Sequence, residues 1–124
     1  MKTTRRQLRR LIHESGLNTT WDMGDRVVSL GDVTAFLDHR ARPVITMSAC
    51  KLKKMLAREI TGIEPHRVHR ADISVPIIVE VDRETGCPIV VLDGNHRLAK
   101  AIKIGADIPM RALYSDERDM LFGA

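Results

Sequence analysis

The stretch from Val90 to Pro109 places the strongest constraint on what this chain can fold into. It reads VVLDGNHRLAKAIKIGADIP, an apolar strand that passes through Asp93-Gly94 into a helical pattern. The periodicity predicts a helix over Leu98–Ile104, with Asn95 to Arg97 supplying its first N–H groups and Gly105 ending it. A strand and a helix joined by so short a turn must pack against each other, which favours a sheet covered by helices.

The flanking patterns predict further short elements. Towards the C-terminus the expected order is strand Val44–Met47, helix Ala49–Ile60 capped by Ser48, polar connection Ile63–Ile73, hairpin strands Val75–Val81 and Cys87–Leu92, strand Ile108–Tyr114 and an acidic tail, Ser115–Ala124. Towards the N-terminus it is helix Thr3–Ser15, irregular Asn18–Ser29 with Trp21 as an anchor, and helix Val33–Arg40 capped by Asp32. This order predicts an α+β fold: a small mixed sheet packed by helices, with an N-terminal helical extension. We therefore divide the chain into a basic extension, residues 1–43, and a domain, residues 44–124.

Positive charge is concentrated at the N-terminus. The first ten residues contain Lys2, Arg5, Arg6, Arg9 and Arg10 and no acid, whereas the rest of the 124 residues is close to neutral. An arginine-rich helix face can contact the phosphates of DNA or RNA, so Arg5, Arg6, Arg9 and Arg10 are candidate nucleic-acid ligands. The alternatives are a solvated face on a docking helix and contact with another partner or an anionic surface.

The sequence also indicates a compartment. No apolar run approaches the ~20 residues that span a bilayer, and no apolar region follows the basic N-terminus as in a signal peptide. Cys50 and Cys87 are too few for a disulfide framework and are expected to be free thiols. We expect a cytoplasmic protein without membrane contact, and a homodimer stays open.

The turn at Asp93-Gly94 carries the side chains that chemistry can use. A helix N-terminus is an anion site, and Gly94 allows the backbone to approach a ligand. His96 can donate to a phosphate or move a proton, and Arg97 and Lys100 can hold phosphate oxygens. Asp93 could cap the helix, orient His96 or hold Mg²⁺.

Cations at this position are unexpected for folding alone. A helix N-terminus is already electropositive, so His96 and Arg97 there cost stability unless an anion lies between them. We therefore interpret the turn as an anion site; the alternative is an ordinary exposed turn. Arg67 and Arg70 could join the site from the preceding connection. His66, His69 and His96 do not complete a known metal-ligand spacing, so no metal ligand is assigned.

The same residues resemble a known signature. The run Ile89–Ala101 followed by Gly105 and Ile108-Pro109, together with the strand Pro76–Val79, looks like the ParB/sulfiredoxin superfamily, over roughly Val44 to Tyr114. The resemblance implies a nucleotide or phosphate cradle at the strand–helix junction. Sulfiredoxins carry a cysteine where this chain has Asn95, so sulfinic-acid repair is not expected. The Asp-Gly-Asn-His-Arg form is closest to the free-serine kinases.

Those kinases place a carboxylate base before the core helix, where this chain has Thr46-Met47-Ser48; Glu59 and Asp72 are the nearest acids. We expect a nucleotide- or phosphate-binding domain that takes ATP, ADP or CTP, with or without Mg²⁺, or a phosphorylated small molecule. The site residues assigned to the ligand are Gly94, Asn95, His96, Arg97 and Lys100. If it is an enzyme, it is a phosphotransferase, nucleotide hydrolase or nuclease with His96 and Asp93 as catalytic residues. The alternative is a non-enzymatic DNA- or RNA-binding or protein-binding regulatory module, of a kind that suits a phage or mobile element.

Overall fold

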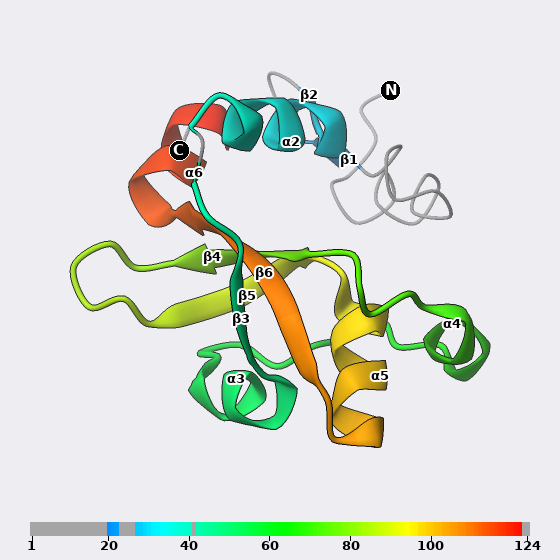
Figure 1. Cartoon of the computed structure of the whole chain (residues 1–124). Coiled ribbons are helices and arrows are strands. Elements are labelled where there is room, and N and C mark those ends of the chain that lie inside the picture. Colours follow the sequence, from blue (N-terminus) through cyan, green and yellow to red (C-terminus); the bar gives the residue numbers. More distant parts are fainter. Residues whose placement is uncertain (1–19, 23–26, 41, 123–124) are drawn as a thin grey trace. The chain divides into compact units, whose positions relative to one another are not determined.

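The computed structural model describes residues 20–22, 27–40 and 42–122. They form a two-stranded sheet and a four-stranded sheet with helices, which confirms the expected α+β class (Figure 1). The chain divides into two compact units, one made of residues 1–41 with 117–124 and the other of residues 42–116. The helix expected at Thr3–Ser15 lies outside the described residues. Within the described ranges, no helix combines the length and apolar character needed to cross a membrane.

The first unit contains a small hairpin and a capped helix. Strands β1 (Thr20–Asp22) and β2 (Val27–Ser29) pair antiparallel, and helix α2 (Leu30–Asp38) follows directly. The Ser29 hydroxyl accepts the N–H of Asp32 at 3.0 Å, and the Asp32 carboxylate accepts the N–H of Ser29 at 2.9 Å. This reciprocal box sets the start of the helix. The expected start at Val33 with Asp32 as cap is therefore wrong. The stretch before it, which was expected to be less regular, contains β1 and β2 among its described residues.

The expected acidic tail is also wrong, because Ser115–Phe122 forms helix α6. Phe122 is 2% exposed, and its ring centroid lies 5.4 Å from that of the buried Trp21. Glu117 is buried as well and pairs with Nε of Arg40 at 3.4 Å. An apolar anchor and an ion pair thus hold the end of the chain within the first unit.

The second unit is built on a mixed sheet. Its strand order is β3-β6-β4-β5, formed by Ile45–Ser48, Asp107–Tyr114, Ile77–Val81 and Pro88–Asp93. Strands β4 and β5 are the expected hairpin, β3 pairs antiparallel with β6, and β4 and β6 run parallel. All five residues of β4 are buried, as expected for a central strand.

Two helices cover one face of this sheet (Figure 1). Helix α3 (Ala49–Met55) contributes Leu52, and helix α5 (Asn95–Ile104) contributes Leu98, each fully buried against the alternate residues of β4. The helix start at Asn95 agrees with the expected role of Asn95 to Arg97 as its first turn. The core therefore lies directly beneath the strand–turn–helix stretch that the sequence singled out.

Helix α3 ends five residues earlier than its apolar period predicted. At Leu56 the backbone leaves the helix with extended geometry, and after it the N–H of Arg58 donates to the carbonyl of Ile89 on β5 at 2.9 Å. A hydrogen bond to the open edge of the sheet thus replaces the next helical turn. Leu56 and Ile60 still pack against the core, although both lie beyond the end of the helix.

The polar connection Ile63–Ile73 contains a helix that was not expected. Helix α4 spans Pro65–Arg70 and begins at a proline, whose missing N–H costs nothing at a first helical position. Glu64 precedes it as the N-cap residue. The Glu64-Pro65 pair was the available sequence signal for this start.

Truncating one buried side chain should measure how much the contact between α5 and the sheet contributes to the free energy of unfolding. We expect Leu98→Ala, at a fully buried position, to lower the free energy of unfolding by about 2–5 kcal/mol through lost burial and the cavity left behind. The matched variant is Ile104→Ala on the same helix, where the side chain is 57% exposed, and it should change stability by no more than about 0.5 kcal/mol. Urea unfolding measures both. Equal losses would contradict this assignment of the core.

Candidate functional site

The candidate site begins at Gly94, which joins β5 to α5. Gly94 has a φ of 105°, in the left-handed region that other residues avoid. A Cβ built there would lie 2.4 Å from Cγ2 of Ile77. The glycine is thus required by close packing on β4, a reason internal to the fold, and no ligand need approach it to explain its presence.

Arg97 is bound within the protein. Its Nη2 donates to Oδ2 of Asp93 at 2.7 Å, and its Nη1 donates to the carbonyls of Pro76 at 2.8 Å and Val75 at 3.3 Å. Both partners of the ion pair are largely shielded, with side chains 16% and 19% exposed. Arg97 therefore ties the end of β5 to the start of β4, and Asp93 serves as its carboxylate partner and does not cap the helix.

Lys100 has a parallel role one turn later. Its Nζ donates to the carbonyls of His69 at 3.0 Å and Ala71 at 2.8 Å, at the C-terminal end of α4. A cation there satisfies unpaired carbonyls and complements the negative end of the helix dipole. Lys100 and Arg97 together hold residues 69–76 against α5, and we call this pair the basic clamp.

Asp72 lies within the segment that the basic clamp holds. The hydroxyl and the N–H of Ser74 donate to Oδ1 of Asp72 at 2.6 and 3.0 Å. These hydrogen bonds, the hydroxyl's first, lower the pKa of Asp72 from its ordinary value of 3.8, and the charges of Lys100 and Arg97 lower that pKa further. Two carboxylates, Asp72 and Asp93, thus accompany the two cations of the clamp.

Asn95 occupies the first turn of α5 and has an unsatisfied oxygen. Its Nδ2 donates to the carbonyl of Thr61 at 3.4 Å, while its buried Oδ1 finds no hydrogen-bond partner among the described residues. No side chain in the described part of the chain caps α5. The first turn therefore combines N–H groups without a side-chain partner and a buried acceptor without a donor.

His96 is oriented by the neighbouring loop. Its Nε2 accepts the backbone N–H of Glu64 at 3.1 Å, so this nitrogen is unprotonated and the neutral ring carries its proton on Nδ1. A proton passed from His96 to a ligand would therefore leave from Nδ1. The same contact brings the loop before α4 to the start of α5.

Glu64 is the carboxylate that sequence reasoning missed. Its backbone is bound to His96, and its side chain, 45% exposed, lies 3.5 Å from Nε2 of His66 and 3.8 Å from Nη1 of Arg67. Arg67 therefore pairs with the residue whose backbone N–H contacts His96. Arg70, in contrast, is exposed at the end of α4. The acids that the sequence suggested for this site were Asp93, as a group that could orient His96, and Glu59 and Asp72, as the nearest acids to the expected place of a base; Glu64 was not among them.

The remaining candidates fall elsewhere. In the ranges the structure describes, no group of three or more His, Cys, Asp and Glu side chains could hold a metal ion. His66, His69 and His96 therefore do not form such a group. Arg5, Arg6, Arg9 and Arg10 lie outside the described residues. Their contact with nucleic acid stays a prediction.

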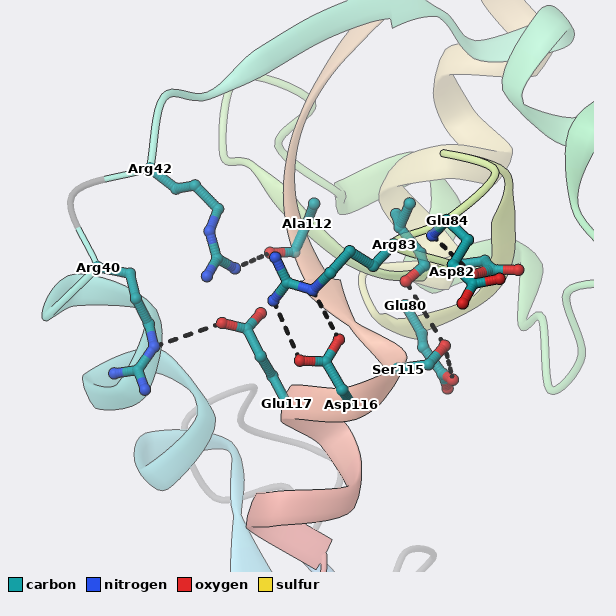
Figure 2. A network of polar contacts seen from close by, with 11 residues as sticks. Arg40, Arg42, Glu80, Asp82, Arg83, Glu84, Ala112, Ser115, Asp116 and Glu117 are labelled. Carbon is teal, nitrogen blue, oxygen red and sulfur yellow. Dashed lines mark hydrogen bonds and ion pairs between the residues drawn. The ribbon is translucent and has the colours of Figure 1, made fainter.

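A second polar cluster lies at the other end of β4 (Figure 2). The Ser115 hydroxyl donates to the buried Glu80 at 2.9 Å, and Arg83 pairs with both carboxylate oxygens of Asp116 at 2.9 and 3.1 Å. The hydrogen bond from Arg83 lowers the pKa of Asp116. Arg83 also lies 4.2 Å from the ring centroid of Tyr114. These contacts tie the β4–β5 turn to the end of β6, and the polar side chains of the cluster serve as hydrogen-bond partners for each other.

Comparison with known proteins adds no identification. No protein-family model, curated protein or solved structure matches this chain. Any functional conclusion therefore depends on the geometry of the site.

The packing reason for Gly94 can be tested by adding a methyl group. Gly94→Ala and Gly86→Ala both place alanine at positive φ, which costs about 1–2 kcal/mol each. A Cβ at Gly86 meets nothing within 4 Å, whereas at Gly94 it overlaps Ile77, which should add about 1–3 kcal/mol. Chemical unfolding of the two variants gives the difference. If Gly94→Ala costs no more than Gly86→Ala, the close approach to Ile77 is wrong.

The hydrogen bonds to Asp72 predict the order of two effects on its pKa. Ser74→Ala should raise the Asp72 pKa towards its ordinary value by more than Lys100→Gln does, because the Ser74 hydroxyl is the largest lowering contribution. A side-chain NMR titration measures both shifts. Because the folded-state pKa is the lower one, the stabilisation from ionised Asp72 is present above the unfolded-state pKa and disappears as the pH falls through the folded-state pKa. A larger shift in Lys100→Gln would overturn this order.

Proposed function

We propose that the first turn of α5 binds a nucleotide, with the phosphate on the backbone N–H groups and a hydroxyl or amino group of the nucleoside on Asn95. The observation that carries the proposal is the buried, unsatisfied Oδ1 of Asn95 at a helix start without a side-chain cap. Gly94 to Arg97 are each partly exposed, so a ligand can reach this turn, and a change of the Asn95 side-chain rotamer would bring its buried Oδ1 to the ligand.

The backbone supplies the attraction for the anion. The first N–H groups of a helix point outward and carry the positive end of the helix dipole, which suits a phosphate. Asp93 would repel a phosphate here, but its ion pair with Arg97 at 2.7 Å compensates that charge. Arg97 and Lys100 therefore act as positioning residues, in place of the direct phosphate clamps that the sequence suggested.

The unsatisfied oxygen selects between kinds of anion. A buried acceptor without a donor costs about 1–3 kcal/mol, and inorganic phosphate mainly offers further acceptors. A nucleotide brings a phosphate for the N–H groups and donors on its ribose or base for Oδ1 of Asn95. This pairing favours a nucleotide over a bare phosphate.

The proposal concerns binding and not turnover. Asp93, the carboxylate that sequence reasoning assigned to catalysis, is held by Arg97, and Nε2 of His96 already accepts the N–H of Glu64. We also propose a relationship to the ParB/sulfiredoxin superfamily. It is supported by the order of the residues from Ile89 to Ala101 and by the mixed sheet around them.

Thermal unfolding with and without ligand tests the proposal. We expect ATP, ADP or CTP, with or without Mg²⁺, to raise the midpoint of the wild type, since a hundredfold excess over Kd stabilises by about 2.7 kcal/mol. Asn95→Ala should reduce this rise to the one that inorganic phosphate gives, because the backbone N–H groups remain and only the contact to the nucleoside is lost. The ligand-free midpoint should change little, because the lost 3.4 Å hydrogen bond to Thr61 is offset by removal of the unsatisfied acceptor.

Lys103→Ala, at an exposed position in the last turn of α5, is the matched control and should keep the full rise. Equal rises with inorganic phosphate and with nucleotides would remove the argument from Asn95. No rise with any nucleotide, or a full rise in Asn95→Ala, would refute the proposed function.

A further inference from the structure

A second basic surface, independent of the proposed nucleotide site, lies on α3 and the residues after it. The stretch Ala49–Arg58 reads ACKLKKMLAR and contains four cations and no acid. Lys51, Lys53, Lys54 and Arg58 are all exposed. We call these four residues the α3 basic surface.

These cations differ from the arginines of the same unit. Arg67, Arg83 and Arg97 each pair with a carboxylate of the fold. Among the described residues, the four side chains of the α3 basic surface have no hydrogen-bond, ion-pair or aromatic partner. These four charges therefore have no partner among the described side chains, whereas the side chains of Arg67, Arg83, Arg97 and Lys100 are bound within the fold.

The arrangement does not serve the stability of the helix. Lys51 lies in the first turn, where the helix dipole favours an acid and none is present. Lys51 and Lys54 are three residues apart, so their like charges repel on neighbouring positions of the helix surface. Lys53 and Lys54 in the last turn are the only members that the dipole favours. A mixed-sign surface would stabilise α3 better.

The placement of the lysines suits a ligand with repeated charges. Ala49 and Leu52 are buried on the inner side of α3, so the lysines at 51, 53 and 54 spread over the exposed arc of the helix and do not converge on one point. A single phosphate cannot contact all of them, whereas successive phosphates of a nucleic-acid strand can. Lysine contacts phosphates as a point charge and reads no base.

We infer that the α3 basic surface binds the phosphate backbone of nucleic acid without sequence preference. The binding should be salt-dependent, since each neutralised phosphate releases counterions. Three lysine–phosphate contacts on duplex DNA account for about a fortyfold loss of affinity between 50 and 200 mM salt. The four residues of this surface do not include the N-terminal arginines, so substitutions can measure the two contributions apart.

The experiment is fluorescence anisotropy of a labelled 24-base-pair duplex, and of one of its strands, with the full chain at 50–200 mM salt. The triple variant Lys51→Gln, Lys53→Gln, Lys54→Gln should bind at least tenfold more weakly at 50 mM salt. It should also lose about 2.7 from the logarithmic salt slope on the duplex. Glutamine has nearly the helix propensity of lysine, so circular dichroism should show an unchanged fold. A variant with Arg5, Arg6, Arg9 and Arg10 changed to Gln should keep this part of the slope.

Single variants provide the matched control for general charge. Lys54→Gln should weaken binding more than Arg83→Gln does, because both remove one cation but Arg83 is already paired with Asp116. The inference is overturned if the triple variant and the wild type share one slope and one affinity, or if Arg83→Gln and Lys54→Gln weaken binding equally. It is also overturned if the wild type binds anionic phosphatidylserine vesicles and no nucleic acid.

Discussion

The guanidinium of Arg97 holds the second unit together where β5 passes into α5. It donates to Asp93 at the end of β5 and to the carbonyls of Val75 and Pro76 before β4. One side chain of α5 therefore joins this helix to the end of one strand and to the start of another. Its ion pair with Asp93 places a paired carboxylate immediately before Gly94, the N-cap residue of α5, where no described side chain caps the first turn. Lysine could not replace this arrangement, because only the planar guanidinium offers donors in fixed directions to all three acceptors.

The ion pair of Arg97 shows that the cations around the start of α5 have partners within the fold. Seen in the sequence, His96, Arg97 and Lys100 are clustered cations that require an anion. In the fold, Arg97 has a carboxylate, Lys100 has the carbonyls that end α4, and His96 accepts an N–H. The groups left without a side-chain partner at this turn are the backbone N–H groups of its first residues and Oδ1 of Asn95. Four exposed cations without a side-chain partner among the described residues are found instead on α3 and just after it, at Lys51, Lys53, Lys54 and Arg58.

Local patterns predicted the parts of the fold that local forces determine. The β4–β5 hairpin, the capping of α3 by Ser48 and the passage from β5 through glycine into α5 follow from alternation, caps and turn residues. The end of α3 did not follow, because it depends on a hydrogen bond from Arg58 to Ile89, 31 residues away. The partners of Arg97 and Lys100 were hidden for the same reason: carbonyls 21 to 31 residues earlier in the chain become neighbours only after the sheet forms.

The extended segment after α3 affects how this sheet can meet other chains. It approaches both ends of β5, through the Arg58–Ile89 hydrogen bond and the contact of Thr61 with Asn95, and so partly occupies that border. The opposite border is β3, which pairs only with β6 within the described residues and contains no charged side chain. Backbone groups of β3 are therefore the ones available for edge-to-edge association. A strand added there would become the fifth strand of this sheet, on the side of β3 away from β6.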